Sequence, residues 1–401
     1  MEQGPDLSNL VSARARRVGG ARLSNPRNSA GKLSFLAGFP DPASLPRQDI
    51  AEATRVALER DGEWALQYGE SQGYSGLVEA LCAKLRRDQG IDVAPENVLI
   101  TNGASQALAL IVELLVDPGD AVLSEAPTWT GAVHNFNAAG AEIIEIPVDS
   151  DGADVDALHA TLTGLHAAGR QPKLLYMIPN FQNPKGVTTT LARRQRIVEL
   201  AATYGLPIVE DDAYFDLRYS GDRLPTMYSM NERGLVMYLG TFSKIMAAGM
   251  RLGWVVAPAD VILRLSGLKH EGGTSPFAGH VAAEFAMSGM LQEHIAELLP
   301  MYKQRRDIML AGLEAGMPEG ASWTTPEGGF FIWLTLPETV TVSDLLPLAA
   351  ERNVEFLDGR NCYFHGDGAH ELRLSYSFAT DEQIREGIAI LSELVRQQAG
   401  A

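Results

Sequence analysis

One lysine stands out because it comes directly after an apolar run of strand character. Residues 235–241 form that run, Lys244 follows it, and Arg251 comes seven residues later. A lysine at the end of a buried strand is costly unless it is paired or covalently engaged. Burial also lowers the pKa of a lysine, and the neutral amine is the form that attacks a carbonyl carbon. The chain has only seven lysines against 26 arginines, so few others compete for this role. A turn with a solvated lysine is the alternative.

Three upstream segments also place polar groups where a predicted strand ends. Residues 97–101 read as a strand, and residues 102–108 then open an apolar helix whose first N–H groups could bind an anion. Asn183 precedes a proline after a second strand, and Asp211 ends a third strand, with Tyr214 three residues on. An ordinary helix start, a turn and an ion pair would explain them singly. Together with Lys244 they predict a ligand site at the carboxyl ends of an open α/β sheet.

With these motifs the chain resembles a pyridoxal-phosphate-dependent aminotransferase of fold type I, class I/II. It is especially similar to the 2-aminoadipate and kynurenine aminotransferase branch, and to the aminotransferase-like half of certain bacterial regulators. The motifs run from Gly38 to Arg373, which is nearly the whole chain.

The resemblance assigns four residues to the reactive part of the cofactor. Lys244 would hold the cofactor aldehyde as a Schiff base and then shuttle a proton. Asp211 would pair with the pyridine nitrogen and keep it protonated. Asn183 and Tyr214 would hydrogen-bond the phenolic oxygen, and Asn183 would also border the substrate.

Further residues would hold the rest of the cofactor. Trp129 stands where the family usually has a tyrosine stacked on the ring, and an indole can also stack. Tyr68 resembles the tyrosine that reaches the phosphate of the neighbouring subunit, with a packed aromatic as the alternative. The phosphate contacts implied within the chain come from Ala104, Ser105, Gln106, Thr241 or Ser243, and Arg251.

The resemblance also indicates how a substrate would bind. Arg373, in an alternating strand, resembles the bidentate anchor of the substrate α-carboxylate, and Gly38 the glycine whose backbone approaches that carboxylate. Arg22 lies where aminoadipate-like enzymes supply an arginine for acidic side chains. Lys185 replaces the usual threonine of the Asn-Pro-Thr-Gly turn, and we expect it to face solvent unless it contacts the mouth of the site. The role of His270, which precedes a loop that could approach the cofactor across a dimer, is open.

The fold class expected is α/β. A large domain would carry a mostly parallel, seven-stranded type of sheet flanked by helices, because strands and helical segments alternate from about residue 96 to 270. A smaller α+β domain would come from both chain ends. The expected division is an N-terminal arm and small-domain segment over 1–45, a cofactor-binding domain over 46–290 and a small C-terminal domain over 291–401. Residues 287–313 and 381–398 read as helices.

Composition excludes several other classes of protein. The net charge of −17 argues against nucleic-acid binding, and no apolar run is long enough to span a membrane. No signal-peptide pattern appears, and two cysteines, Cys82 and Cys362, make no disulfide framework, which suits the cytoplasm. The eight scattered histidines give no metal spacing, so no metal is expected.

Three functions are then compared. The favoured one is an aminotransferase that moves an amino group between an L-amino acid and a 2-oxo acid, acting as a homodimer with shared sites. The donor could be 2-aminoadipate, glutamate or a bulky apolar or aromatic amino acid. The alternative is β-elimination, decarboxylation, cyclisation or oxidation of an amino acid on the same scaffold. A cofactor-sensing regulator is disfavoured, because about 35 residues before Gly38 are too few for a DNA-binding module.

Overall fold

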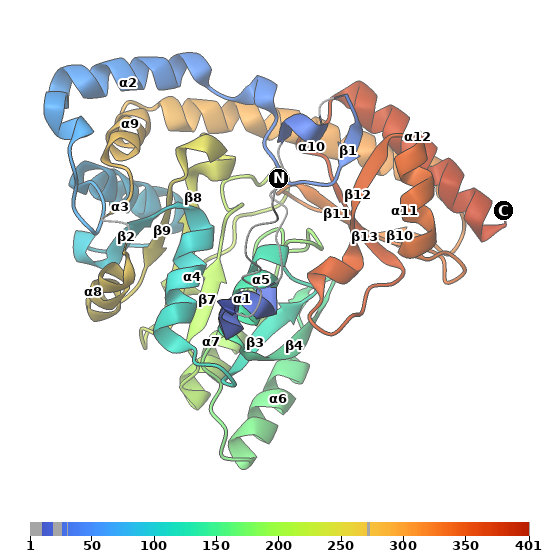
Figure 1. The fold of residues 1–401 in the computed structure, drawn as a ribbon, viewed down its shortest axis with the longest axis horizontal. Helices are drawn as coiled ribbons and strands as arrows, with labels where there is room; N and C mark the ends of the chain where they lie inside the picture. Colours follow the sequence, from blue (N-terminus) through green and yellow to red (C-terminus); the bar gives the residue numbers. More distant parts are fainter. Residues whose placement is uncertain (1–9, 19–25, 30, 271–272, 401) are drawn as a thin grey trace.

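The computed structural model describes residues 10–18, 26–29, 31–270 and 273–400, which contain two β-sheets (Figure 1). The larger sheet is mostly parallel: the run β8-β7-β6-β3-β4 is parallel, and β2, β9 and β5 pair antiparallel with their neighbours. The two-residue β5 adds an eighth strand to the seven expected. In spatial order the strands are β2 (Val98–Thr101), β9 (Gly253–Val256), β8 (Val236–Thr241), β7 (Ile208–Asp211), β6 (Leu175–Met177), β3 (Ala121–Ala126), β4 (Glu142–Asp149) and β5 (Gly152–Ala153).

Helices cover both faces of this sheet. On one face of the sheet, apolar side chains of the strands pack against α4 (Gly103–Leu115), α5 (Thr130–Ala139) and α8 (Ala259–Leu268). The opposite face packs on α6 and α7 and, nearer β2 and β9, on α3 and α9. These four helices are α3 (Ser75–Gln89), α6 (Val155–Ala167), α7 (Leu191–Tyr204) and α9 (Pro276–Met287). A fifth helix, α2 (Arg47–Asp61), packs beside α9. The strands read as apolar runs because both faces are covered.

The smaller sheet combines the two ends of the chain. Its order is β1 (Leu33–Phe35), β12 (Val354–Asp358), β13 (Glu371–Ser375), β11 (Phe331–Thr335) and β10 (Ser322–Trp323). Side chains alternate between the two faces of this sheet. Leu334 and Leu374 point to the core, whereas Trp333 and Arg373, which lie opposite each other on neighbouring strands, point to the other face. The core side is covered by α10 (Met290–Gly316), α11 (Val342–Glu351) and α12 (Asp381–Ala399).

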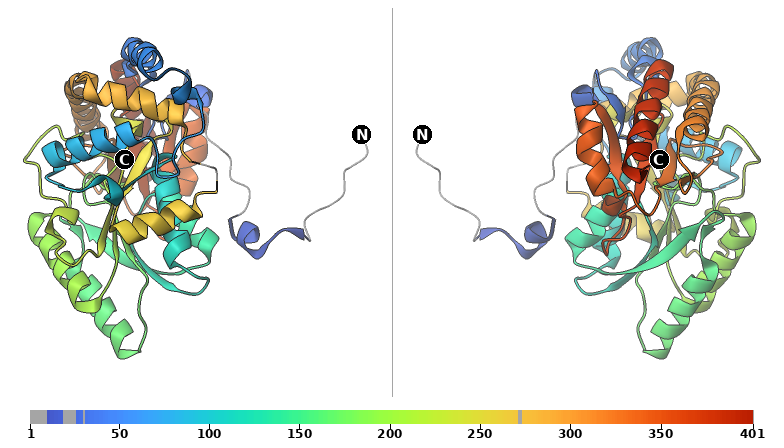
Figure 2. Two further views of the ribbon diagram at one scale, coloured as in Figure 1. Left: turned by 90° about the vertical axis from the view of Figure 1, so that its left-hand side faces the viewer. Right: turned by 90° about the vertical axis from the view of Figure 1, so that its right-hand side faces the viewer.

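Two predicted C-terminal helices are present with small shifts in their ends. Helix α10 continues through Pro300, although the apolar pattern is interrupted there. Helix α12 begins with a capping box between Thr380 and Gln383, in which each side chain bonds the other residue's backbone N–H. Helix α1 (Ala13–Val18) lies outside the main body beside α5, where Arg17 donates to the carbonyl oxygen of Ala138 at 3.0 Å (Figure 2).

The topology brings the sequence motifs together. Strands β6, β7 and β8 are parallel, and β2 has the same direction because two antiparallel steps, through β9, separate it from β8. The carboxyl ends of these four strands therefore share one edge of the large sheet, the usual position of ligands in open α/β sheets. The described residues contain neither a helix long and apolar enough to cross a membrane nor a cluster of three His, Cys, Asp or Glu side chains suited to a metal ion.

Candidate active site

A cavity of about 140 Å³ lies at this edge of the sheet. Most of the residues predicted for the cofactor line it, and Ile178 and Ala213 complete its wall. The predicted residues are Ala104, Ser105, Trp129, Asn183, Asp211, Tyr214, Thr241, Ser243, Lys244 and Arg251.

Lys244 enters the cavity from a short 3-10 turn that follows β8. The turn is stabilised by Thr241, whose hydroxyl accepts a hydrogen bond from the Ser243 N–H at 3.1 Å. The Lys244 Nζ donates to the carbonyl oxygen of Gly38 at 2.8 Å. Burial, followed by the positive charges of Arg373 and Arg251, lowers the pKa of Lys244 to about 8. About a tenth of the amine is therefore neutral at pH 7, far more than for a lysine of ordinary pKa, and the neutral form is the nucleophile.

Asp211 has one carboxylate oxygen bonded and the other open. The Tyr176 hydroxyl donates to Oδ2 at 2.8 Å, whereas Oδ1 is buried and has no hydrogen-bond partner among the described residues. Burial raises the pKa of Asp211 to about 6, although the hydrogen bond from Tyr176 acts in the opposite direction. A buried oxygen without a donor is costly, so this atom is suited to a ligand N–H.

The α4 N-terminus and Arg251 form a cradle of the kind that binds phosphate. Arg251 has a left-handed backbone (φ 54°), and its Nη2 donates to the carbonyl oxygen of Asn102 at 3.2 Å. A Cβ on Gly103 would lie 3.0 Å from that Nη2, and one on Gly253 would lie 2.6 Å from the carbonyl carbon of Gly103. The two glycines thus let the guanidinium and β9 approach the helix N–H groups closely.

Arg373, on the small sheet, lies next to the cavity and bonds Asn183, which lines it. Its Nη1 donates to Asn183 Oδ1 at 2.8 Å and its Nη2 to the Leu36 carbonyl oxygen at 2.7 Å, while its Nε is buried without a partner. The guanidinium carbon lies 4.1 Å from the centre of the Phe331 ring. A Cβ on Gly38 would lie 2.5 Å from the same ring, so only glycine allows this loop to approach. Arg373 and Asn183 therefore connect the two sheets.

The aromatic residues occupy different parts of the site. Tyr214 is buried against Phe330 and Phe331, with ring centres 5.5 and 5.8 Å away, and burial raises the pKa of its hydroxyl. Trp129 directly precedes α5 and lines the cavity. Tyr68 is 90% exposed and does not line the cavity of its own chain.

Four other predicted positions have different outcomes. Gln106 is not part of the cavity wall, and its side-chain oxygen accepts from the Asn102 N–H at 2.7 Å. His270 is exposed. Arg22 lies outside the described residues. The expectation that Lys185 faces solvent is wrong: its side chain is partly buried, and its Nζ donates to the Val148 carbonyl oxygen at 2.5 Å.

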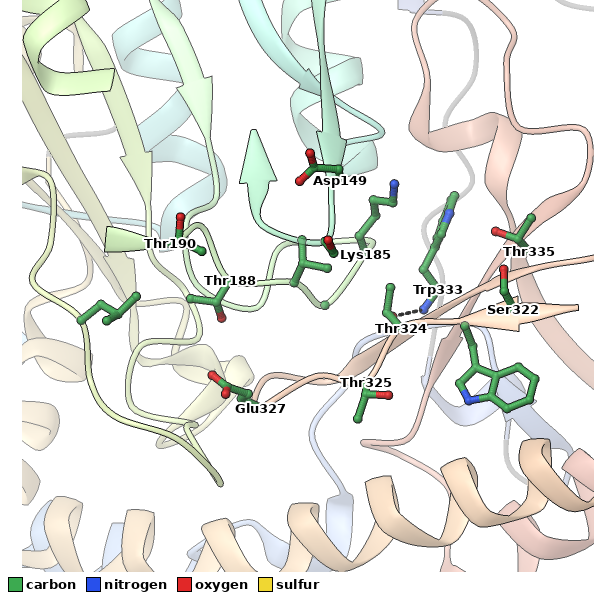
Figure 3. Close-up of a pocket in the computed structure, with 15 residues that line it drawn as sticks. Asp149, Lys185, Thr188, Thr190, Ser322, Thr324, Thr325, Glu327, Trp333 and Thr335 are labelled. Carbon is green, nitrogen blue, oxygen red and sulfur yellow. Dashed lines mark hydrogen bonds between the residues drawn. The ribbon is translucent and has the colours of Figure 1, made fainter. Parts of the chain in front are cut away.

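Lys185 instead lines a second, larger cleft of about 580 Å³, between the Asn183 turn and the β10–β11 hairpin (Figure 3). Hydroxyl groups surround it, and the Trp333 backbone N–H donates to the Thr324 hydroxyl at 3.0 Å. Asp149 is held by Arg193 through two bonds of 2.6 and 2.7 Å. The charged groups of this cleft therefore already have partners.

The donor set of the small cavity fits the expected cofactor. Each part of pyridoxal phosphate meets a complementary group: the N–H groups of α4 and Arg251 suit the phosphate, Asp211 Oδ1 suits a protonated ring nitrogen, and the Lys244 amine suits the aldehyde. When bound, this cofactor supplies an electron sink for the substrate Cα.

Sequence reasoning missed the positioning role open to Tyr176. The register of β6 and β7 pairs Tyr176 with Val209, so strand parity places Tyr176 and Asp211 on the same face of the sheet. That parity was available in the sequence, but the pairing register was not.

Comparisons with known proteins identify the family of the chain. The model of the family "Aminotransferase class I and II" matches residues 32–391. An aromatic-amino-acid aminotransferase of Thermococcus litoralis is 39% identical, over 91% of this chain and 88% of that protein. A 2-aminoadipate transaminase of Thermus thermophilus is 35% identical, over 91% and 90% respectively. The crystal structure of a Pyrococcus horikoshii kynurenine aminotransferase, in complex with PMP, superimposes with a TM-score of 0.93 at 36% identity, covering 99% of both chains.

The chain therefore belongs to the class I and II aminotransferase family. It has the fold type I architecture and is a pyridoxal-phosphate-dependent transaminase whose substrates are amino acids and 2-oxo acids.

Proposed function

We propose that the enzyme accepts aromatic amino acids and 2-aminoadipate as amino donors and uses the cavity residues in the following roles. The observation that carries these roles is that Lys244 and Asp211 line one cavity while Arg373 bonds Asn183 of its wall, and each of the three has bonding capacity left for a ligand. The names of the Thermococcus litoralis and Thermus thermophilus relatives support the choice of donors.

In this proposal Lys244 has two tasks. Its partly neutral amine would hold the cofactor by condensing with its aldehyde and releasing water, and the same amine would hold the proton removed from the substrate Cα. Gly38 fixes the amine in the free protein through its carbonyl oxygen, 2.8 Å from Nζ. Asp211 Oδ1 keeps the proton on the ring nitrogen, and Asn183 and Tyr214 contact the phenolic oxygen. Trp129 stacks on the ring.

The substrate carboxylate binds Arg373, whose fork can hold two oxygens once it leaves Leu36 and Asn183. Arg22 is proposed to pair with an acidic side chain. The phosphate is held by Arg251, together with a cradle made by Ala104, Ser105, Gln106, Thr241 and Ser243.

A test of the donor range uses visible absorbance of the purified enzyme with pyridoxal phosphate. Single amino acids are added to it: 2-aminoadipate, glutamate, tyrosine, phenylalanine and leucine. A donor should bleach the colour, and a 2-oxo acid should restore it. Lys244→Ala is the control and should show no reversible change. Release of ammonia or carbon dioxide in place of reversible bleaching would favour the alternative chemistry.

An unchanged preference for 2-aminoadipate in Arg22→Ala would remove that residue from the proposal.

We also propose a homodimer with shared active sites, in which Tyr68 binds the phosphate held by the partner subunit. Trp64, Leu66 and Tyr68 are 71, 68 and 90% exposed, which is unusual for three neighbouring large side chains. Mixing Tyr68→Ala with Lys244→Ala subunits tests this sharing. Random re-assortment should restore about a quarter of the wild-type sites, because half the dimers would contain one intact site. A mixture no more active than the average of its parents would contradict it.

A cytoplasmic location and the domain division 1–45, 46–290 and 291–401 complete the proposal. Both cysteines are buried and free, as suits a reducing compartment. The membership of β1 in the small sheet supports assigning the N-terminal segment to the small domain.

A further inference from the structure

Tyr176 has a polar contact that the reaction roles above do not use. It lies on β6, its side chain is fully buried, and its ring packs edge-on against Phe136 of α5 at 5.8 Å. Its hydroxyl donates to Asp211 Oδ2 at 2.8 Å. Burial and the nearby Asp211 carboxylate raise the pKa of Tyr176 well above its usual value. The hydroxyl therefore keeps its proton, and remains a hydrogen-bond donor, around neutral pH.

The residue that follows β7 provides a contrast. Asp212 receives two bonds from the Asn180 amide, at 2.9 and 3.0 Å, and a third from the Tyr238 hydroxyl at 3.2 Å. It does not line the cavity. Asp212 is thus bonded through both oxygens, whereas Asp211, which lines the cavity, has one oxygen held and one without a partner among the described residues.

We infer that Tyr176 is a positioning residue for Asp211: by holding Oδ2 it directs Oδ1 to the cofactor ring nitrogen and keeps the carboxylate ionised there. This inference rests on the proposed role of Asp211. Two aspects of the geometry support it. The ring of Tyr176 is fixed by packing, so its hydroxyl has a defined place, and a charge-assisted hydrogen bond is stronger than a neutral one.

The other titratable groups around this pair do not replace Tyr176. Asp212 adds negative charge, which raises the pKa of Asp211 further. Glu125 is near Tyr176, but burial raises its pKa to about 8, so it is mostly neutral at pH 7. Tyr214 has its own pKa raised by burial and stays protonated. Tyr176 is the side chain whose hydrogen bond favours the ionised form of Asp211.

The test compares the holoenzymes of Tyr176→Phe and Tyr238→Phe at pH 7.5. Each variant loses one buried hydroxyl that donates to a buried aspartate, and only the first concerns the aspartate in the cavity. The main readout is the ¹⁵N chemical shift of pyridoxal phosphate labelled at the ring nitrogen, which reports whether that nitrogen is protonated. The second is the cofactor concentration at half-saturation. Thermal unfolding checks that both variants fold.

The expected result is specific to Tyr176→Phe. Its ring-nitrogen signal should move toward the unprotonated value, and half-saturation should need about tenfold more cofactor, the effect of one hydrogen bond to a charged group. Tyr238→Phe should keep the wild-type signal and affinity. Equal behaviour of the two variants would overturn the inference.

Asp211→Asn separates this inference from the role on which it rests. A changed signal in Asp211→Asn with a wild-type signal in Tyr176→Phe would overturn the positioning role alone. A wild-type signal in Asp211→Asn would overturn the proposed role of Asp211 and the inference with it.

Discussion

The two cavities beside the Asn183 turn differ in a way that size does not reveal. The smaller, of about 140 Å³, is lined by two groups with bonding capacity left over, Asp211 Oδ1 and the Lys244 amine, and Arg373, whose Nε also lacks a partner, bonds Asn183 of its wall. The larger, of about 580 Å³, is lined by charged groups that protein partners already satisfy, such as Asp149 by Arg193. Unsatisfied polar groups, which are costly in a buried place, indicate the reactive cavity better than volume does.

The strongest test of this contrast removes one lysine from each cavity. Lys244→Ala should lower kcat by about 10⁴-fold or more, because the anchor and the proton carrier are the same amine. Steady-state assays with a 2-oxo acid acceptor measure the loss. If Lys185→Ala lost as much activity, the two cavities would not differ as described.

Arg373→Lys tests the cation that lies beside the small cavity and bonds Asn183 of its wall. The ammonium cannot form the two parallel bonds of a guanidinium, so kcat/KM for amino acids should fall by about 100-fold. Cofactor affinity should change little, because Arg373 does not line the cofactor cavity. A loss of cofactor affinity as large as the loss of kcat/KM would show a structural effect of the bridge to Asn183.

The pH dependence of cofactor capture should reflect the lowered pKa of Lys244, about 8. The neutral amine is the attacking form, and its fraction grows as pH rises. The rate of holoenzyme formation from apoenzyme should therefore increase about tenfold between pH 7 and pH 9. Stopped-flow absorbance measures it. A profile that is flat over this range would contradict a pKa near 8.

Lys185→Thr should have the smallest effect. The variant loses one bond to the Val148 carbonyl oxygen in the large cleft. We expect kcat/KM to change by less than about threefold and Tm to fall by about 3 °C or less. Kinetics and calorimetry on the purified variant check this. A tenfold loss of kcat/KM with unchanged Tm would give the large cleft a part in the reaction.

The gathering of the candidate site residues at one edge of the sheet could be predicted from the sequence because each motif is local. Asp211 and Lys244 directly follow apolar strands, and the carboxyl ends of parallel strands meet at one edge. The same holds for the start of α4, where a glycine follows β2.

Long-range pairing could not be predicted in this way. The pairing of β1 with β12 joins Leu33 to Val354, and nothing in either segment specifies the other. Lys84 has a polar helical sequence context, yet it is buried in an ion pair with Asp216, 132 residues away. Lys185 was expected in solvent for the same reason, since the carbonyl oxygen that it bonds belongs to β4.

The segment 36–38 supplies carbonyl oxygens to two cations of the site. Leu36 accepts from Arg373 and Gly38 accepts from Lys244, so under the proposed roles this short piece of backbone occupies bonds that the cofactor and the substrate carboxylate would take. When the cofactor takes the amine and a substrate carboxylate takes the guanidinium, the segment loses both bonds. Faster hydrogen exchange of the Gly38 amide on loading would reveal that release. The segment 36–38 thus competes with the cofactor for Lys244 and with the amino acid for Arg373. Binding of either ligand removes one of the two bonds that hold the segment, and it should therefore make the second bond easier to break.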